Sequence, residues 1–228
     1  MNSDKFTPRL LGFMFVFVAV ASLLSGLMSM SLIESDNISN SMINISDNPT
    51  MMQMSIVGEL ITAIGIVLLA VLLYTALKKQ NKIIARWAFG LWIIEAAALA
   101  GSRLFATALL YTSQEFVKAG APDSSYFQTL GSLFHESTQS GYDIHMLFFS
   151  LGGILFYYLF LKSKYVPIVL PLWGIIALSL AFIGTLFGFF DYDVPIFVFL
   201  PILPLELAIG VWLMVKGFRP QEIKSKSG

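Results

Sequence analysis

Long apolar segments alternate along this chain with short clusters of lysine and arginine. Each apolar segment has about the 20 residues that a helix needs to cross the hydrocarbon core of a bilayer. There are six such segments: Leu10–Ile33, Met54–Leu77, Trp87–Tyr111, Tyr142–Leu161, Val166–Phe190 and Ile196–Val215. The pattern predicts an all-α integral membrane bundle of six transmembrane helices. We expect one transmembrane domain over residues 1–220 and a cytoplasmic tail over residues 221–228.

The cationic clusters lie between alternate apolar segments, which places twelve of the fourteen lysines and arginines on one side of the predicted membrane. They are Lys5, Arg9, Lys78, Lys79, Lys82, Arg86, Lys162, Lys164, Lys216, Arg219, Lys224 and Lys226. The positive-inside rule assigns that side to the cytoplasm, so both termini are expected there. The first apolar segment is longer than the core of a cleaved signal peptide, and we expect it to be retained as an anchor in the cell membrane.

Composition excludes several classes of protein. A content of 57% hydrophobic and 12% charged residues is atypical of a soluble domain. The chain has no cysteine, which excludes disulfides, thiolate metal sites and iron–sulfur clusters. The cationic clusters are short and lack interleaved aromatic residues, so no nucleic-acid partner is expected. The lipid bilayer is the expected partner, no cofactor is expected, and the sequence identifies no protein partner.

Two connections on the predicted outer side are long. The first, Glu34–Thr50, is rich in Ser, Asn and Asp and is expected to be an exposed irregular loop. The second, Thr112–Gly141, contains a helix-start signal at Pro122 to Ser124. Apolar residues then recur on one helical face: Tyr126, Phe127, Leu130, Leu133 and Phe134. This spacing predicts a short interfacial helix that either shields the bundle or covers a binding pocket.

Ionisable residues interrupt four of the apolar segments, although a charge inside a bilayer costs several kcal/mol. They are Glu59, Glu95, Arg103, Asp143, His145 and Glu206. With the orientation given above, these residues lie in the outer half and centre of the membrane. Their distribution predicts a polar pocket that opens toward the outside.

Arg103 is the natural counter-ion for Glu59 or Glu206, because a guanidinium in a low-dielectric medium requires a partner. The alternative is a buried ion-pair network that fixes the helices and has no other role. Three prolines precede Glu206 in the last segment: Pro195, Pro201 and Pro204. They predict a broken helix, which would either line a cavity or form a simple kink.

Metal and nucleophile chemistry have weaker support. The two histidines, His135 and His145, could form a mixed site with Glu59 and Glu136, but no HExxH motif is present. Methionines near the outer side, Met42 among them, are the thioether ligands that Cu(I) favours, and are also common apolar filler. No GxSxG motif or ordered Ser/His/Asp set indicates a hydrolase.

Four stretches of the chain resemble an uncharacterised bacterial family of membrane proteins, Domain of Unknown Function 4386. They are Trp92–Ala97, His145–Tyr158, Lys162–Gly174 and Pro204–Arg219. The resemblance covers nearly the whole chain except the longer first outer loop. It implies a compact helical bundle in the bacterial cytoplasmic membrane, and it makes Glu95, His145 and Glu206 the residues to test first. It implies no activity.

The sequence favours a non-enzymatic protein that binds or transports a small ligand or ion. The expected ligand-binding residues are Glu59, Glu95, Arg103, His145 and Glu206. Among them, His145 is the member expected to respond to pH. The alternatives are an intramembrane, metal-assisted enzyme acting on lipid or peptide, and a structural or signalling subunit whose buried charges only order the helices.

Overall fold

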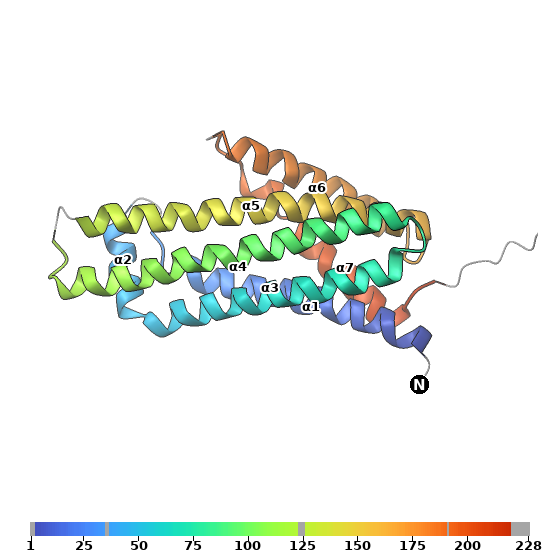
Figure 1. Cartoon of the computed structure of the whole chain (residues 1–228), viewed down its shortest axis with the longest axis horizontal. Helices are drawn as coiled ribbons and strands as arrows, with labels where there is room; N and C mark the ends of the chain where they lie inside the picture. The colour runs from blue at the N-terminus through green and yellow to red at the C-terminus, as the bar shows by residue number, and fades with distance from the viewer. Residues whose placement is uncertain (1–2, 35–36, 123–125, 191, 220–228) are drawn as a thin grey trace, which may run out of the picture. The chain divides into compact units, whose positions relative to one another are not determined.

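The computed structural model describes residues 3–34, 37–122, 126–190 and 192–219 (Figure 1). Along the chain the helices are α1 (Ser3–Met30), α2 (Ile38–Asp47), α3 (Pro49–Leu77), α4 (Lys82–Lys118), α5 (Tyr126–Ser163), α6 (Val169–Gly188), the 3₁₀ turn η1 (Ile196–Val198) and α7 (Ile202–Lys216). These ranges contain no strand. Six helical segments are long and apolar enough to cross a membrane, the last combining η1 and α7. The predicted all-α class with six spans and one additional short helix is confirmed, and the chain has the features of a multi-pass membrane protein.

The short helix is α2, and it lies in the first outer connection rather than the second. The prediction of an irregular loop over Glu34–Thr50 is therefore wrong for most of its length. The side chain of Asn37 caps α2 by accepting a hydrogen bond from the Asn40 N–H at 3.0 Å. Met42 and Ile45, three residues apart, are fully buried on one face. The polar residues that indicated a loop are the cap and exposed face of an amphipathic helix.

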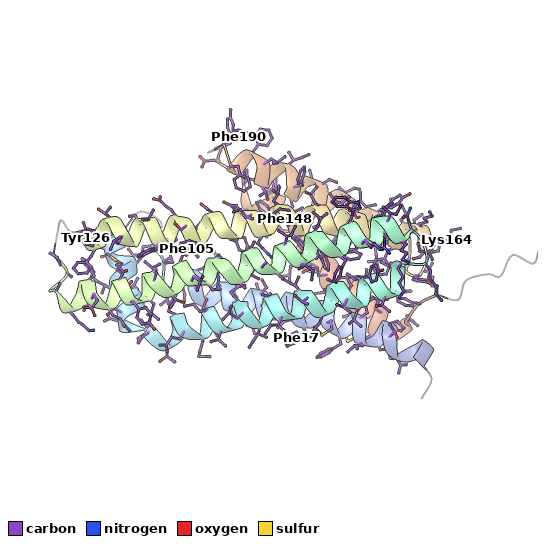
Figure 2. All side chains as sticks on the ribbon, in the orientation of Figure 1. Phe17, Phe105, Tyr126, Phe148, Lys164 and Phe190 are labelled. Carbon is purple, nitrogen blue, oxygen red and sulfur yellow. The ribbon has the colours of Figure 1, made fainter. Side chains whose placement is uncertain are left out.

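The residues predicted to form a separate interfacial helix are instead the first turns of α5. No proline interrupts the backbone between Tyr126 and the apolar segment that follows, so the helical hydrogen bonds continue without a break. Phe127 and Phe134 pack against buried apolar residues of the bundle and do not form a separate surface element. Figure 2 shows Tyr126 at the start of this helix, with an exposed side chain.

Helices α4 and α5 are much longer than a membrane span requires. They contain 37 and 38 residues and are continuous in Figure 1. At 1.5 Å per residue each is about 55 Å long, against about 30 Å for the hydrocarbon core. Both helices therefore extend beyond the apolar segments that predicted them, Trp87–Tyr111 and Tyr142–Leu161.

The last span is broken, as the prolines predicted. Pro195 precedes η1, and Pro201 precedes α7. Between the two helical pieces the Ile202 N–H donates to the Phe199 carbonyl at 3.2 Å, which is a turn and not a continuing α-helix. Pro204 lies in the first turn of α7, where a missing N–H is tolerated.

The chain forms two compact units. Unit 1 comprises Met1–Phe17, Leu68–Ile93 and Leu147–Gly228, and unit 2 comprises Val18–Val67 and Ile94–Met146. The boundary falls within α1, α3, α4 and α5, so each of these helices contributes residues to both units. The single domain over residues 1–220 remains a prediction.

Unit 1 is held together by close helix contacts and aromatic packing. A Cβ atom on Gly12 of α1 would lie 2.5 Å from the Gly210 carbonyl oxygen of α7, so these two helices approach as closely as glycine allows. The Trp92 indole Nε1 donates to the Phe149 carbonyl oxygen at 3.1 Å. Phe190, after the end of α6, is exposed (Figure 2).

Unit 2 has an apolar cluster around α2. Met42 and Ile45 meet residues of α3 and α4 there, including Ile56 and Ala106. A Cβ atom on Gly131 of α5 would lie 2.6 Å from the Met42 sulfur, so a larger residue at position 131 requires the flexible Met42 side chain to move. Ile56 and Ala106 are each three residues from an ionisable residue, Glu59 and Arg103 respectively. In both α3 and α4, the apolar cluster and an ionisable residue are therefore separated by about one helical turn.

Candidate functional site

Unit 2 buries four ionisable side chains that come from three helices. They are Glu59 of α3, Glu95 and Arg103 of α4, and His145 of α5, with exposed fractions of 4%, 1%, 8% and 8%. Because charged side chains are almost never buried this far without partners, their immediate surroundings decide what they can do.

Glu95 and His145 form the first contact of the cluster. The His145 Nδ1 atom lies 3.7 Å from Glu95 Oε1, which is longer than a direct hydrogen bond but within the range of an ion pair. The ring of Tyr142, one turn earlier on α5, lies 5.3 Å from the imidazole ring. This contact joins α4 to α5 through groups that can exchange a proton.

Arg103 lies between the acids but hydrogen-bonds to a neutral group. Its Nε and Nη2 atoms donate to the Ser102 hydroxyl oxygen at 3.1 and 2.8 Å. The guanidinium also attracts the Glu59 carboxyl group across the α3–α4 contact. Arg103 therefore supplies the positive charge of the cluster, while its Nε and Nη2 atoms donate to a hydroxyl.

Glu59 is the remaining ionisable member of the cluster. Its Oε2 atom is buried and has no hydrogen-bond partner within the described part of the chain. The Ser25 hydroxyl of α1 lies beside this carboxyl group. That hydroxyl donates its proton to the Ala21 carbonyl oxygen at 2.8 Å, which leaves its oxygen lone pairs available. Glu59 Oε2 therefore remains available for a further interaction, and Ser25 Oγ, from a different helix, lies beside the same carboxyl group.

Two glycines bring the helices together at the cluster. A Cβ atom on Gly58 would lie 2.8 Å from the Ser25 Cβ, and one on Gly141 of α5 would clash with the Ser102 Cβ. Each glycine therefore allows a close approach next to a member of the cluster. The same contacts position Ser25 and Ser102 beside Glu59 and Arg103.

Glu206 lies in unit 1, on α7. Its side chain is half-buried, and the buried Tyr157 of α5 is its electrostatic neighbour. The structure thus brings together four of the five residues predicted to share a pocket, and it assigns the fifth to the other unit. Of the two acids predicted as counter-ions of Arg103, Glu59 lies in the same unit as Arg103 and attracts it electrostatically.

The two histidines do not share a ligand site. His135 and His145 are ten residues apart on α5, which separates them by about 15 Å along the helix. Among the described residues, no group of three or more His, Asp or Glu side chains could hold a metal ion. Asp143 is half-buried, and Glu136 is exposed.

Sequence reasoning did not identify Ser25 and Ser102 as part of this cluster. Serine is common in membrane helices, and its hydroxyl usually bonds to the preceding turn, as both do here. The available signal was position: Ser102 precedes Arg103, while Ser25 lies in the predicted first span.

Comparison with known families decides where this chain belongs. It matches the family described as Domain of unknown function (DUF4386) over residues 10–217. The chain is a member of this family. The match confirms the resemblance drawn from the sequence and covers every residue of the cluster. No curated protein and no solved structure gave a significant match.

Proposed function

We propose that this DUF4386 protein binds or transports a small ligand or ion within the cell membrane. The binding residues are Glu59, Glu95, Arg103 and His145 of unit 2. The observation that carries the proposal is the burial of these four ionisable groups in one unit, where Glu59 Oε2 has no hydrogen-bond partner among the residues that the structure describes. In a bilayer such an arrangement is costly and is typical of ion and substrate sites.

We further propose that both termini are cytoplasmic. The support is the distribution of charge: twelve of the fourteen lysines and arginines belong to unit 1, including those in the short turns between helices. Unit 2 contains only Arg103 and Lys118. By the positive-inside rule, the helix ends and short turns that contain these twelve residues face the cytoplasm.

Cysteine labelling tests this orientation without background, because the chain has no cysteine. The exposed positions Ala119 and Lys79 are each replaced by cysteine in turn. A membrane-impermeant maleimide applied to intact cells should label Ala119→Cys, whereas Lys79→Cys should be labelled only after lysis. The reverse pattern would show the opposite orientation.

Thermal unfolding of the purified protein tests ligand binding. Wild type is screened in detergent against small cations, anions and zwitterions, and any ligand that raises Tm is tested on Glu95→Gln and His145→Gln. The matched control is Glu115→Gln, on the same helix as Glu95 but exposed and paired only with Lys118. We expect wild type and the control to respond, and the two cluster variants to lose the response.

A purely structural role for the cluster gives a different result. If the buried charges only order the helices, Glu95→Gln and His145→Gln lower Tm and no ligand stabilises wild type. That outcome would refute the binding proposal and leave a scaffold protein.

A further inference from the structure

The charges buried in unit 2 do not balance. Two carboxyl groups, Glu59 and Glu95, are buried in the same unit as one guanidinium, Arg103. The remaining titratable neighbours are His145, which is neutral in its unprotonated form, and the Tyr142 phenol. With both acids ionised and the imidazole neutral, the cluster therefore has one surplus negative charge. An uncompensated charge in a low-dielectric interior is strongly unfavourable, so the surplus requires one additional positive charge.

The contacts indicate where that charge is bound. The Glu95 carboxyl group has the His145 imidazole at 3.7 Å. Glu59 Oε2, in contrast, has no hydrogen-bond partner among the described residues, although the Glu59 side chain is only 4% exposed. Arg103 attracts Glu59, but its Nε and Nη2 atoms donate to Ser102. An unsatisfied oxygen of the cluster that lacks the imidazole contact of Glu95 is thus Glu59 Oε2, with Ser25 Oγ beside it.

The space at this position is small. Ser25 is 2% exposed, and a Cβ atom on Gly58 would lie 2.8 Å from the Ser25 Cβ, so α1 and α3 are in close contact. Carboxylate and hydroxyl oxygens are hard ligands, which suit a proton or an alkali cation better than a soft metal.

We propose that the ligand of the unit 2 cluster is a single small positive charge, a proton or an alkali cation, held by Glu59 Oε2 and Ser25 Oγ. Arg103 balances one of the two acids, and the bound charge balances the other. This inference rests on the proposed function, because it names the ligand of the same site.

The test compares Tm of purified wild type, Glu59→Gln and Ser25→Ala with the exposed control Glu115→Gln. The first series replaces choline chloride with NaCl, KCl or LiCl at constant ionic strength and pH. The second uses choline chloride alone and varies pH from 5 to 9. Gel filtration of each variant shows whether it remains folded and monodisperse, and Ser25→Ala keeps the carboxyl group if Glu59→Gln does not fold.

An alkali-cation site predicts that one cation at about a hundredfold excess over its Kd raises Tm of wild type and the control by roughly 5 °C. Ser25→Ala should need about tenfold more cation, and Glu59→Gln should not respond. A proton site predicts no difference between cations. In that case wild-type Tm falls as pH rises, because the folded state loses its bound proton, and Glu59→Gln loses this dependence.

Two results would overturn the inference. In the first, wild type and Glu59→Gln respond identically to both series, which removes Glu59 from the site. In the second, only an anion or a neutral compound stabilises wild type, which leaves the proposed function intact but contradicts a positively charged ligand. Failure of the proposed function itself is distinguishable, because then no compound in the broader screen raises Tm and Tm shows no Glu59-dependent response to pH.

Discussion

The two compact units place their charges in opposite ways. Unit 2 buries Glu59, Glu95, Arg103 and His145, which are all of the buried acidic, basic and imidazole side chains in the described ranges. The buried polar side chains in the described part of unit 1 are uncharged, and they include Ser150, Ser163, Thr185 and the Tyr157 phenol. Unit 1 instead has twelve of the fourteen cationic residues, and those described, such as Lys78 and Arg86, lie near helix ends.

This difference separates two roles of charge in a membrane protein. Charges near helix ends remain hydrated, cost little and bias the orientation of the chain. Charges in the middle of a span require compensation from other helices, so each substitution there changes the environment of the rest. The comparison therefore predicts large, coupled effects in unit 2 and small, independent effects among the cations of unit 1.

The largest effect is expected from Arg103→Ala, which removes the only guanidinium from a cluster with two acids. Breaking a buried pair by removing one partner costs about 3–5 kcal/mol. Unfolding in detergent measures the loss, and Arg86→Ala, on the same helix but exposed, should have little effect.

A double variant sharpens this result. Glu59→Gln should recover part of the stability lost in Arg103→Ala, because it also removes a buried negative charge. Additive losses of stability in the double variant would mean that Arg103 and Glu59 act independently. Equal losses of stability in Arg103→Ala and Arg86→Ala would remove the contrast between the units.

The second effect concerns the apolar cluster of unit 2. A Cβ atom on Gly131 would lie 3.3 Å from Ile38 Cγ1, the position that a cysteine sulfur at residue 38 can occupy, so two cysteine sulfurs can meet here once the Met42 side chain moves. Because no native cysteine competes, Ile38→Cys/Gly131→Cys should form one intramolecular disulfide under mild oxidation. Closing a loop of this length stabilises a fold by about 2–4 kcal/mol.

Mass spectrometry after alkylation and Tm before and after reduction measure the outcome. The single variants Ile38→Cys and Gly131→Cys control for the cost of each substitution. A pair that remains reduced, or that links two molecules, would contradict the packing of α2 against α5.

The six spans were predictable because bilayer thickness imposes a minimum apolar length on each one. The ends of α4 and α5 were not, because Glu115 and Glu136 end the apolar pattern without ending the helix. A helix continues for as long as its backbone hydrogen bonds do, and no proline interrupts either of them. Helix α2 was missed since its polar residues also fit a loop, and only tertiary packing shows that Met42 and Ile45 are buried.

The sequence predicted which charged residues of the candidate site compensate one another. A guanidinium in a span requires an acid, and the structure brings Glu59, Glu95 and His145 into the same unit as Arg103. Which serines join them depends on how each helix is rotated about its axis, which spacing in one chain does not determine. The assignment of Glu206 to the other unit depends on the fold in the same way.

A smaller effect is expected at the helix contact beside Arg103. In Gly141→Ala the new methyl group meets the Ser102 Cβ, so α4 and α5 must separate at a cost of about 1–3 kcal/mol. Gly101→Ala is the matched control, because Gly101 precedes Ser102 on the same helix and a Cβ atom there meets nothing within 4 Å. The control should be unchanged or up to about 1 kcal/mol more stable. Equal losses in both variants would show that helix propensity, not the α4–α5 contact, controls stability here.

The smallest effect is expected from Glu206→Gln in unit 1. Glu206 is half-buried, and no charged side chain is buried among the described residues of its unit, so an isosteric neutral amide should change the unfolding free energy by less than about 1 kcal/mol. The stabilisation by cation or proton should also remain, measured by the Tm series used for Glu59→Gln. If Glu206→Gln instead abolishes that response, the five-residue pocket predicted from the sequence is correct. Glu206 would then be one of the binding residues, and the contrast between the units would apply only to the cations near the helix ends.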